Sequence, residues 1–168
     1  MSNSSDLRSV IAALAGVLGS PHFPKGDLAE LRRMTYDTPP LPFWRVLYDY
    51  VPEVLRTNES MENHWITILN GMAIMAPEIH SEAPSHSVGA IFTLFPAQRM
   101  NQFLRSKGKN LSDQIRLFSR LCASKNTPVD WSTLALLLFS SGKQGEGKIK
   151  RNVAKEYVKE YGKKEAVA

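Results

Sequence analysis

The chain has 168 residues, and its 21 Lys and Arg against 16 Asp and Glu give a net charge of +5. Its 43% hydrophobic and 22% charged residues are typical of soluble globular proteins and exclude disordered, collagen-like and integral membrane proteins. The length fits one domain or two small domains that share an interface, and the single cysteine, Cys122, excludes an internal disulfide and fits a reducing compartment.

The first expected element is an amphipathic helix from about Asp6 to Gly19. Arg8 followed by an apolar stretch resembles a secretory signal, but Asp6 cancels the charge of Arg8 and leaves this region neutral. We therefore expect a helix of the folded protein, and a cytoplasmic location.

Three further helical patterns follow in the first half of the chain. The segment 26–33 is expected to form a helix whose first turn is capped by the carboxylate of Asp27. After a proline-rich break at 38–42, apolar residues recur with helical spacing at 43–55 and again at 65–75, where the next proline ends the pattern.

Residues 77–87 have the composition of an exposed loop that carries two histidines, His80 and His86. A metal site needs a third ligand at a fixed geometry, and the sequence contains no HExxH motif and no Cys/His grouping. We therefore expect solvated histidines, no metal and no cofactor.

The clearest helical patterns lie in the second half. One helix is expected from Pro96 to about Arg105, followed by a short link at 106–110. The next helix, from about Leu111 to Ser124, places apolar residues at 4-3-4 spacing at Leu111, Ile115, Phe118 and Cys122. Cys122 is thus expected in the core and not as a nucleophile.

Two more helices complete the chain. One opens near Trp131, with Asp130 or Thr127 as its cap. The last is a basic amphipathic helix at 148–161 whose apolar side carries Ile149, Val153, Tyr157 and Val158. Because no segment alternates with period two for long, strands are expected to be absent or minor, and the patterns predict an all-α fold.

The segment 142–148 fits GxxxxGK, the core of a phosphate-binding loop. A P-loop needs Ser or Thr after the lysine to hold Mg²⁺, and Ile149 stands there instead. The apolar run before the segment is capped like a helix, not a strand. We therefore interpret 142–147 as a flexible basic loop between two helices and expect no enzymatic activity.

The charge of the chain is divided unevenly. Residues 1–98 carry six Lys and Arg against ten Asp and Glu, whereas residues 99–168 carry fifteen against six. This asymmetry indicates an anionic partner for the second half, although a purely solubilising role for the charge stays open.

The basic residues concentrate on a predicted helical hairpin. Between residues 99 and 125 there are seven basic residues and one acidic residue, Asp113, which is placed to pair with Arg116. Arginine suits phosphate because its planar guanidinium bonds two oxygens and keeps its charge. The predicted phosphate contacts are Arg99, Arg105, Lys107, Lys109, Arg116 and Arg120.

The order of motifs along the chain resembles the CasB family, the small subunit of the type I-E CRISPR Cascade complex. The resemblance rests on motifs at 26–33, at 87–89, at 103–105, at 120–121 and at 129–134. It implies an all-helical, non-catalytic protein without metal, built of two small helical bundles packed together, which we expect at residues 1–95 and 96–168. Arg105 and Arg120 look like the family's backbone-contacting arginines. Arg32 and Arg33 match its front motif and are further expected nucleic-acid contacts, with the alternative that one of them is structural and bonds the interface between the bundles.

The resemblance also implies the setting in which the protein works. It implies a homodimer inside a crRNA-guided complex with other Cascade subunits, where it contacts the target DNA backbone and helps to hold the displaced strand open in antiviral defence. No membrane and no small-molecule substrate are expected. Two alternatives stay open: a helical adaptor whose basic face binds an acidic protein, and a small nucleotide-dependent enzyme that uses residues 142–149.

Overall fold

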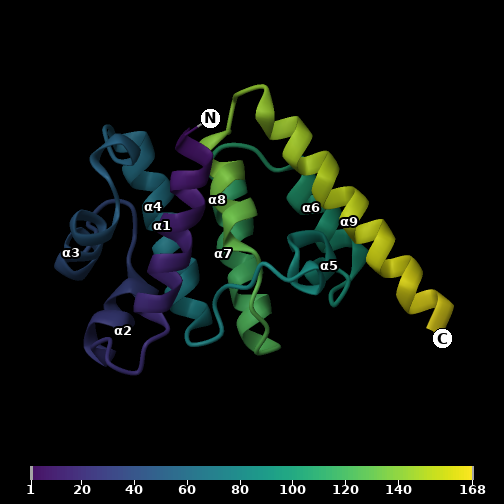
Figure 1. Ribbon diagram of the computed structural model, residues 1–168, viewed down its shortest axis with the longest axis horizontal. Coiled ribbons are helices and arrows are strands. Elements are labelled where there is room, and N and C mark those ends of the chain that lie inside the picture. The colour runs from purple at the N-terminus through teal and green to yellow at the C-terminus, as the bar shows by residue number, and fades with distance from the viewer. Residues whose placement is uncertain (1, 168) are drawn as a thin grey trace.

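The computed structural model describes residues 2–167, and this part of the chain is built from α-helices joined by short turns (Figure 1). A lone β-bridge between His80 and Val129 is the sole strand-like pairing within these residues. The all-α prediction is therefore confirmed. The helices are α1 (Ser2–Leu18), α2 (Lys25–Arg33), α3 (Leu41–Tyr50), α4 (Glu59–Met75), α5 (Val88–Phe92), α6 (Ala97–Arg105), α7 (Lys109–Ser124), α8 (Trp131–Phe139) and α9 (Gly145–Val167).

The centre of the molecule is formed by α4, α7 and α8. Helix α4 packs along α7, and α1 packs against α8. Figure 1 shows α2 and α3 at one end of the molecule and α5, α6 and α9 at the other, with α9 running outward to the C-terminus. Both the α4–α7 and the α5–α9 contacts join segments on either side of residue 95. The division into 1–95 and 96–168 stays a prediction about folding units.

The core is one connected cluster of apolar side chains. Trp65 and Trp131 are fully buried within it, and Trp65 Nε1 donates a hydrogen bond to the Leu55 carbonyl at 2.8 Å. Phe92 stacks on Phe118 with ring centroids 4.2 Å apart, which ties α5 to α7. This burial is the main force that holds the helices together.

Two glycines allow helices to approach closely. A Cβ at Gly71 would lie 2.3 Å from the Trp131 ring, so only glycine fits where α4 meets α8. A Cβ at Gly89 would lie 2.2 Å from the Val153 carbonyl oxygen, so α5 can touch the backbone of α9 there. Gly89 belongs to the 87–89 motif, and Ser87 caps the same helix by accepting a bond from Ala90 N at 3.2 Å.

Several local predictions are confirmed. The 4-3-4 apolar set of α7 is buried, and burial raises the pKa of the Cys122 thiol to about 12, so Cys122 is a core residue. Asp130 is the N-cap of α8, with its Oδ1 accepting from Ser132 N at 3.0 Å.

Other local predictions are wrong. Asp27 makes no capping bond, because α2 already begins at Lys25 after Pro24 and Asp27 lies inside its first turn. Helix α9 begins at Gly145, so half of the expected 142–147 loop is helical, and Val158 is 68% exposed and does not line the apolar side. Among residues 2–167 there is no helix with the length and apolar character needed to cross a membrane.

Candidate nucleic-acid interface

The basic residues predicted on α6 and α7 reach the surface. Arg105, Lys107, Lys109 and Arg120 are exposed, whereas Arg99 and Arg116 are half-buried. Within residues 2–167, none of these six side chains forms an ion pair. The expected Asp113–Arg116 pair is therefore absent, and none of these cations lies within ion-pair distance of a carboxylate in this part of the chain.

Three of these residues form a row along α7. The sequence predicted Lys109 in the link before the helix. That prediction is wrong, because Lys109 is the first residue of α7. It stands seven residues before Arg116 and eleven before Arg120, so helical periodicity places all three on the side opposite Leu111 and Ile115. We call Lys109, Arg116 and Arg120 the α7 row. At 1.5 Å per residue it is about 16 Å long.

The turn between α6 and α7 adds to the positive potential of this row. Gly108 adopts φ +56°, and no side chain caps the N-terminus of α7. Free backbone N–H groups at a helix N-terminus carry partial positive charge. Lys107 and Lys109 flank this end, so the positive end of the helix and two ammonium groups lie together.

Helix α9 fixes that turn in place. Lys150 Nζ donates to the Ser106 carbonyl at 2.6 Å and pairs with Glu146 Oε1 at 3.1 Å. Glu146 Oε2 accepts from Gly142 N at 3.0 Å. The Gly142 N–H, followed by Lys150 and Lys107, lowers the pKa of the Glu146 carboxyl. Glu146 and Lys150 therefore hold the α6–α7 turn against the start of α9.

Arg32 and Arg33 lie elsewhere. Arg32 Nε donates to the Ala73 carbonyl of α4 at 2.8 Å, and Asn70 of α4 donates to the Leu31 and Arg32 carbonyls at 2.9 and 3.0 Å. We call this contact the α2–α4 junction. Arg33 is exposed on α2. Figure 1 shows that α2 and α6 lie at opposite ends of the molecule. The structure does not bring these two arginines to the α7 row.

Among the comparisons with known proteins, a match to one family shows where the chain belongs. Residues 27–158 match the family of CRISPR-associated protein Cse2, which covers most of the chain. The chain belongs to the Cse2 family. This is the CasB family, the small subunit of the type I-E Cascade, so the resemblance found in the sequence is confirmed. Neither the curated proteins nor the solved structures contain a significant match.

Membership of the Cse2 family makes the chain a subunit of a CRISPR Cascade complex that associates with other Cascade subunits. Cse2 is a structural subunit family and not a known enzyme family. The segment that resembles a P-loop follows a helix, α8, where such a loop would follow a strand.

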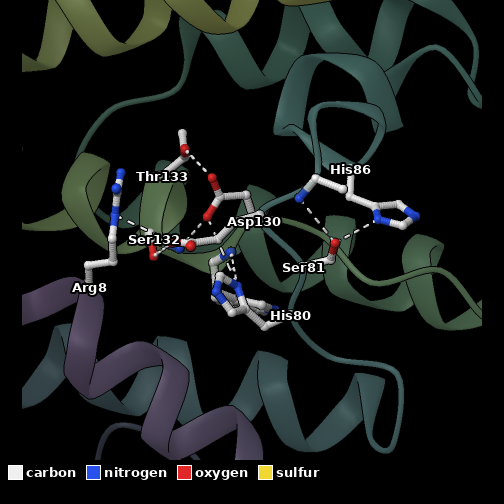
Figure 2. Close-up of polar contacts among 10 residues, drawn as sticks. Arg8, His80, Ser81, His86, Asp130, Ser132 and Thr133 are labelled. Carbon is white, nitrogen blue, oxygen red and sulfur yellow. Dashed lines mark hydrogen bonds and ion pairs between the residues drawn. The ribbon is translucent and has the colours of Figure 1, made fainter.

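Of the two histidines of residues 77–87, His80 has a buried side chain, in contrast to the prediction, and His86 is half-buried. The side chain of His80 is 8% exposed, and its Nδ1 accepts a bond from Trp131 N at 3.0 Å (Figure 2). His86 Nδ1 lies 2.8 Å from Ser81 Oγ, and the His86 carbonyl accepts from Asp130 N at 3.0 Å. These contacts join residues distant in sequence, so composition alone did not reveal them.

His80 also belongs to a group with metal-binding chemistry. One ligand atom each from His80, Glu82 and Asp130 lie within 4.8 Å of one another. However, His80 and Asp130 already accept bonds from the first N–H groups of α8, and Arg8 Nε lies 3.4 Å from Glu82. A cation would have to displace these bonds at the positive end of a helix. The group therefore serves as the cap of α8.

Sequence reasoning did not find two adjoining pockets beside the α6–α7 turn. The α4–α7 pocket, with a volume of about 750 Å³, is lined among others by Tyr36, Asn63, His64, Lys109, Ser112 and Ser141. The Gly142 pocket, of about 610 Å³, is lined among others by Lys107, Gly108, Ser141, Gly142, Lys143 and Lys150. Gly108 and Ser141 line both pockets, so the two are neighbours.

Proposed function

We propose that this Cse2 chain binds the sugar–phosphate backbone of DNA within Cascade, without sequence specificity, and so stabilises the opened R-loop. The proposal is supported above all by the cations from Arg105 to Arg120, which form no ion pair within residues 2–167 and, apart from the half-buried Arg116, are exposed. A charged surface that serves only solubility usually mixes both signs. Here Arg105, Lys107 and the three residues of the α7 row make five cations, and Asp113 is the one carboxylate on α7.

The geometry of the α7 row suits a backbone and not a base sequence. A row of about 16 Å passes more than one phosphate, because each DNA strand carries one phosphate per roughly 3.4 Å of helix axis. Phosphate contacts fix position without reading bases. Sequence is then read by pairing between the crRNA guide and the target strand, with this subunit acting as a non-catalytic clamp.

The proposal includes a homodimer beside the crRNA and target DNA. Exposed apolar side chains lie at opposite ends of the molecule: Tyr48 is 60% exposed on α3, and Val158 is 68% exposed on α9 (Figure 1). Two copies arranged head to tail would cover both. Cross-linking of the assembled complex between α3 of one copy and α9 of the other tests this arrangement, and its absence would contradict it.

The experiment that tests DNA binding removes two cations that take no part in packing. Arg105→Ala with Arg120→Ala should leave folding intact and weaken target binding by the assembled complex, since both side chains are exposed. Lys25→Ala is the control for the loss of a surface cation, because Lys25 is exposed at the start of α2, at the other end of the molecule from α6 (Figure 1). Asp113→Ala should not weaken binding. If the double variant binds like the wild type, the adaptor function with an acidic protein partner becomes the better explanation.

A further inference from the structure

The two adjoining pockets differ in charge. The Gly142 pocket is lined by Lys107, Lys143 and Lys150 against the single carboxylate of Glu146. Because Lys150 pairs with Glu146, Lys107 and Lys143 are its two cations without an ion pair in the described part of the chain. The α4–α7 pocket is lined by one lysine, Lys109, against two carboxylates, Asp37 and Glu59, so it has no excess of positive charge. The first therefore suits an anion such as a phosphate group, and the second suits a neutral polar group.

The wall of the α4–α7 pocket offers unused hydrogen-bonding groups. The side chains of Asn63 and His64 are half-buried, and neither makes a hydrogen bond to any residue in the range 2–167. Burial and the nearby Lys143 lower the pKa of His64, so its imidazole is neutral and carries one donor and one acceptor. An amide and a neutral imidazole match the mixed donor and acceptor edge of a nucleobase.

Aromatic and apolar groups complete this wall. Tyr36 and Leu138 line the same pocket, and Phe139 packs edge-on against His64 at 5.0 Å. Bases stack on aromatic and imidazole faces in single-strand binding sites. Its volume of about 750 Å³ lies within the range of roughly 300–1,000 Å³ that is usual for small-ligand pockets.

We propose that the two pockets together hold one unpaired nucleotide, with its base in the α4–α7 pocket and its phosphate in the Gly142 pocket. Lys109 lines the α4–α7 pocket and begins the α7 row, so a strand that follows the row passes the mouth of the pocket. The inference thus rests on the proposed function and gives a role to the Gly-rich segment 142–147. Since the guide pairs with the target strand, the displaced strand supplies unpaired bases.

The test compares two single strands with equal charge, an oligothymidine and the same strand with abasic sites, by fluorescence anisotropy with the full-length chain. The wild type should bind the intact strand roughly fivefold or more tightly than the abasic one, since a stacked base adds to the backbone term. Asn63→Ala with His64→Ala should bring this ratio to about one and leave the salt dependence unchanged. Asn152→Ala, an exposed amide on α9, is the matched control and should keep the ratio.

A second variant keeps the proposal testable if Asn63→Ala with His64→Ala does not fold. Lys143→Gln changes an exposed side chain, and it should weaken both strands and reduce the slope of log affinity against log salt by roughly 0.7, the loss of one phosphate contact on a single strand. An unchanged slope for Lys143→Gln would mean that the Gly142 pocket binds no phosphate group, and it would overturn that part of the proposal.

The remaining outcomes separate this inference from the function on which it rests. Equal, salt-dependent binding of intact and abasic strands would overturn the nucleotide pocket and leave backbone binding standing. Failure to bind either strand would overturn both. Competition by thymidine monophosphate at micromolar concentration would assign the pockets to a free nucleotide and overturn the strand as its source.

Discussion

The α2–α4 junction and the α6–α7 segment both carry arginines that match family motifs, but the two regions use them differently. At the junction, Arg32 donates to a carbonyl of α4 and helps to join two helices. In the α6–α7 segment, Arg105 and Arg120 are exposed and form no ion pair within residues 2–167. In the α6–α7 segment the matched arginines are thus candidates for DNA binding, because they are free and lie beside other free cations.

The largest effect is expected at the buried centre of the junction. Asn70→Ala should lower the free energy of unfolding by about 3 kcal/mol, because the carbonyls of Leu31 and Arg32 lose their donor inside the protein. Urea denaturation measures this change, with Asn152→Ala as an exposed control that should stay within about 0.5 kcal/mol. A loss below about 1 kcal/mol for Asn70→Ala would mean that the junction does not hold α2.

A smaller effect is expected for the arginine of the junction. Arg32→Ala should cost about 1 kcal/mol of stability through its lost bond to Ala73, and it should leave the affinity of the folded protein for DNA unchanged. Arg33→Ala, at an exposed neighbour, is the control for stability. Weakened DNA binding by a fully folded Arg32→Ala variant would show that Arg32 also contacts DNA, and it would contradict the difference between the two regions.

The stability that Glu146 contributes by holding the α6–α7 turn against α9 should depend on pH. The lowered pKa of Glu146 means that folding favours its ionised form, so its contribution is complete above the unfolded pKa of about 4.3 and is lost as pH falls through the folded value. Glu146→Gln should therefore destabilise by about 1 kcal/mol at pH 7 and less in acid. Thermal unfolding from pH 7 down to pH 3 measures this, and a difference that does not shrink on acidification speaks against it.

The sequence predicts best what local spacing decides. The apolar residues of α7 and the Asp130 cap are correct because both depend on neighbours within one or two turns of a helix. Asp27 failed as a cap because Pro24 already starts the helix one turn earlier. Even there the error is local, and the helix itself was predicted.

The sequence could not predict contacts between distant segments. His80 is buried because residues 79–87 pack on residues 129–131, some 50 positions away. Glu146 turns inward to reach Gly142 and Lys150, so a segment that looks like a flexible loop starts a helix. For the candidate site, the sequence identified the cations of α6 and α7, but the Asn63–His64 pocket wall needed the fold.

The free cations of the α6–α7 segment, and not the motif arginines in general, are expected to bind phosphate. The most direct measurement is the slope of log affinity of the assembled complex for target DNA against log salt, for the wild type, Arg32→Ala and Arg105→Ala/Arg120→Ala. The slope should fall by roughly two for the double variant, about one per lost phosphate contact, and stay unchanged for Arg32→Ala. A wild-type slope in the double variant would contradict the claim.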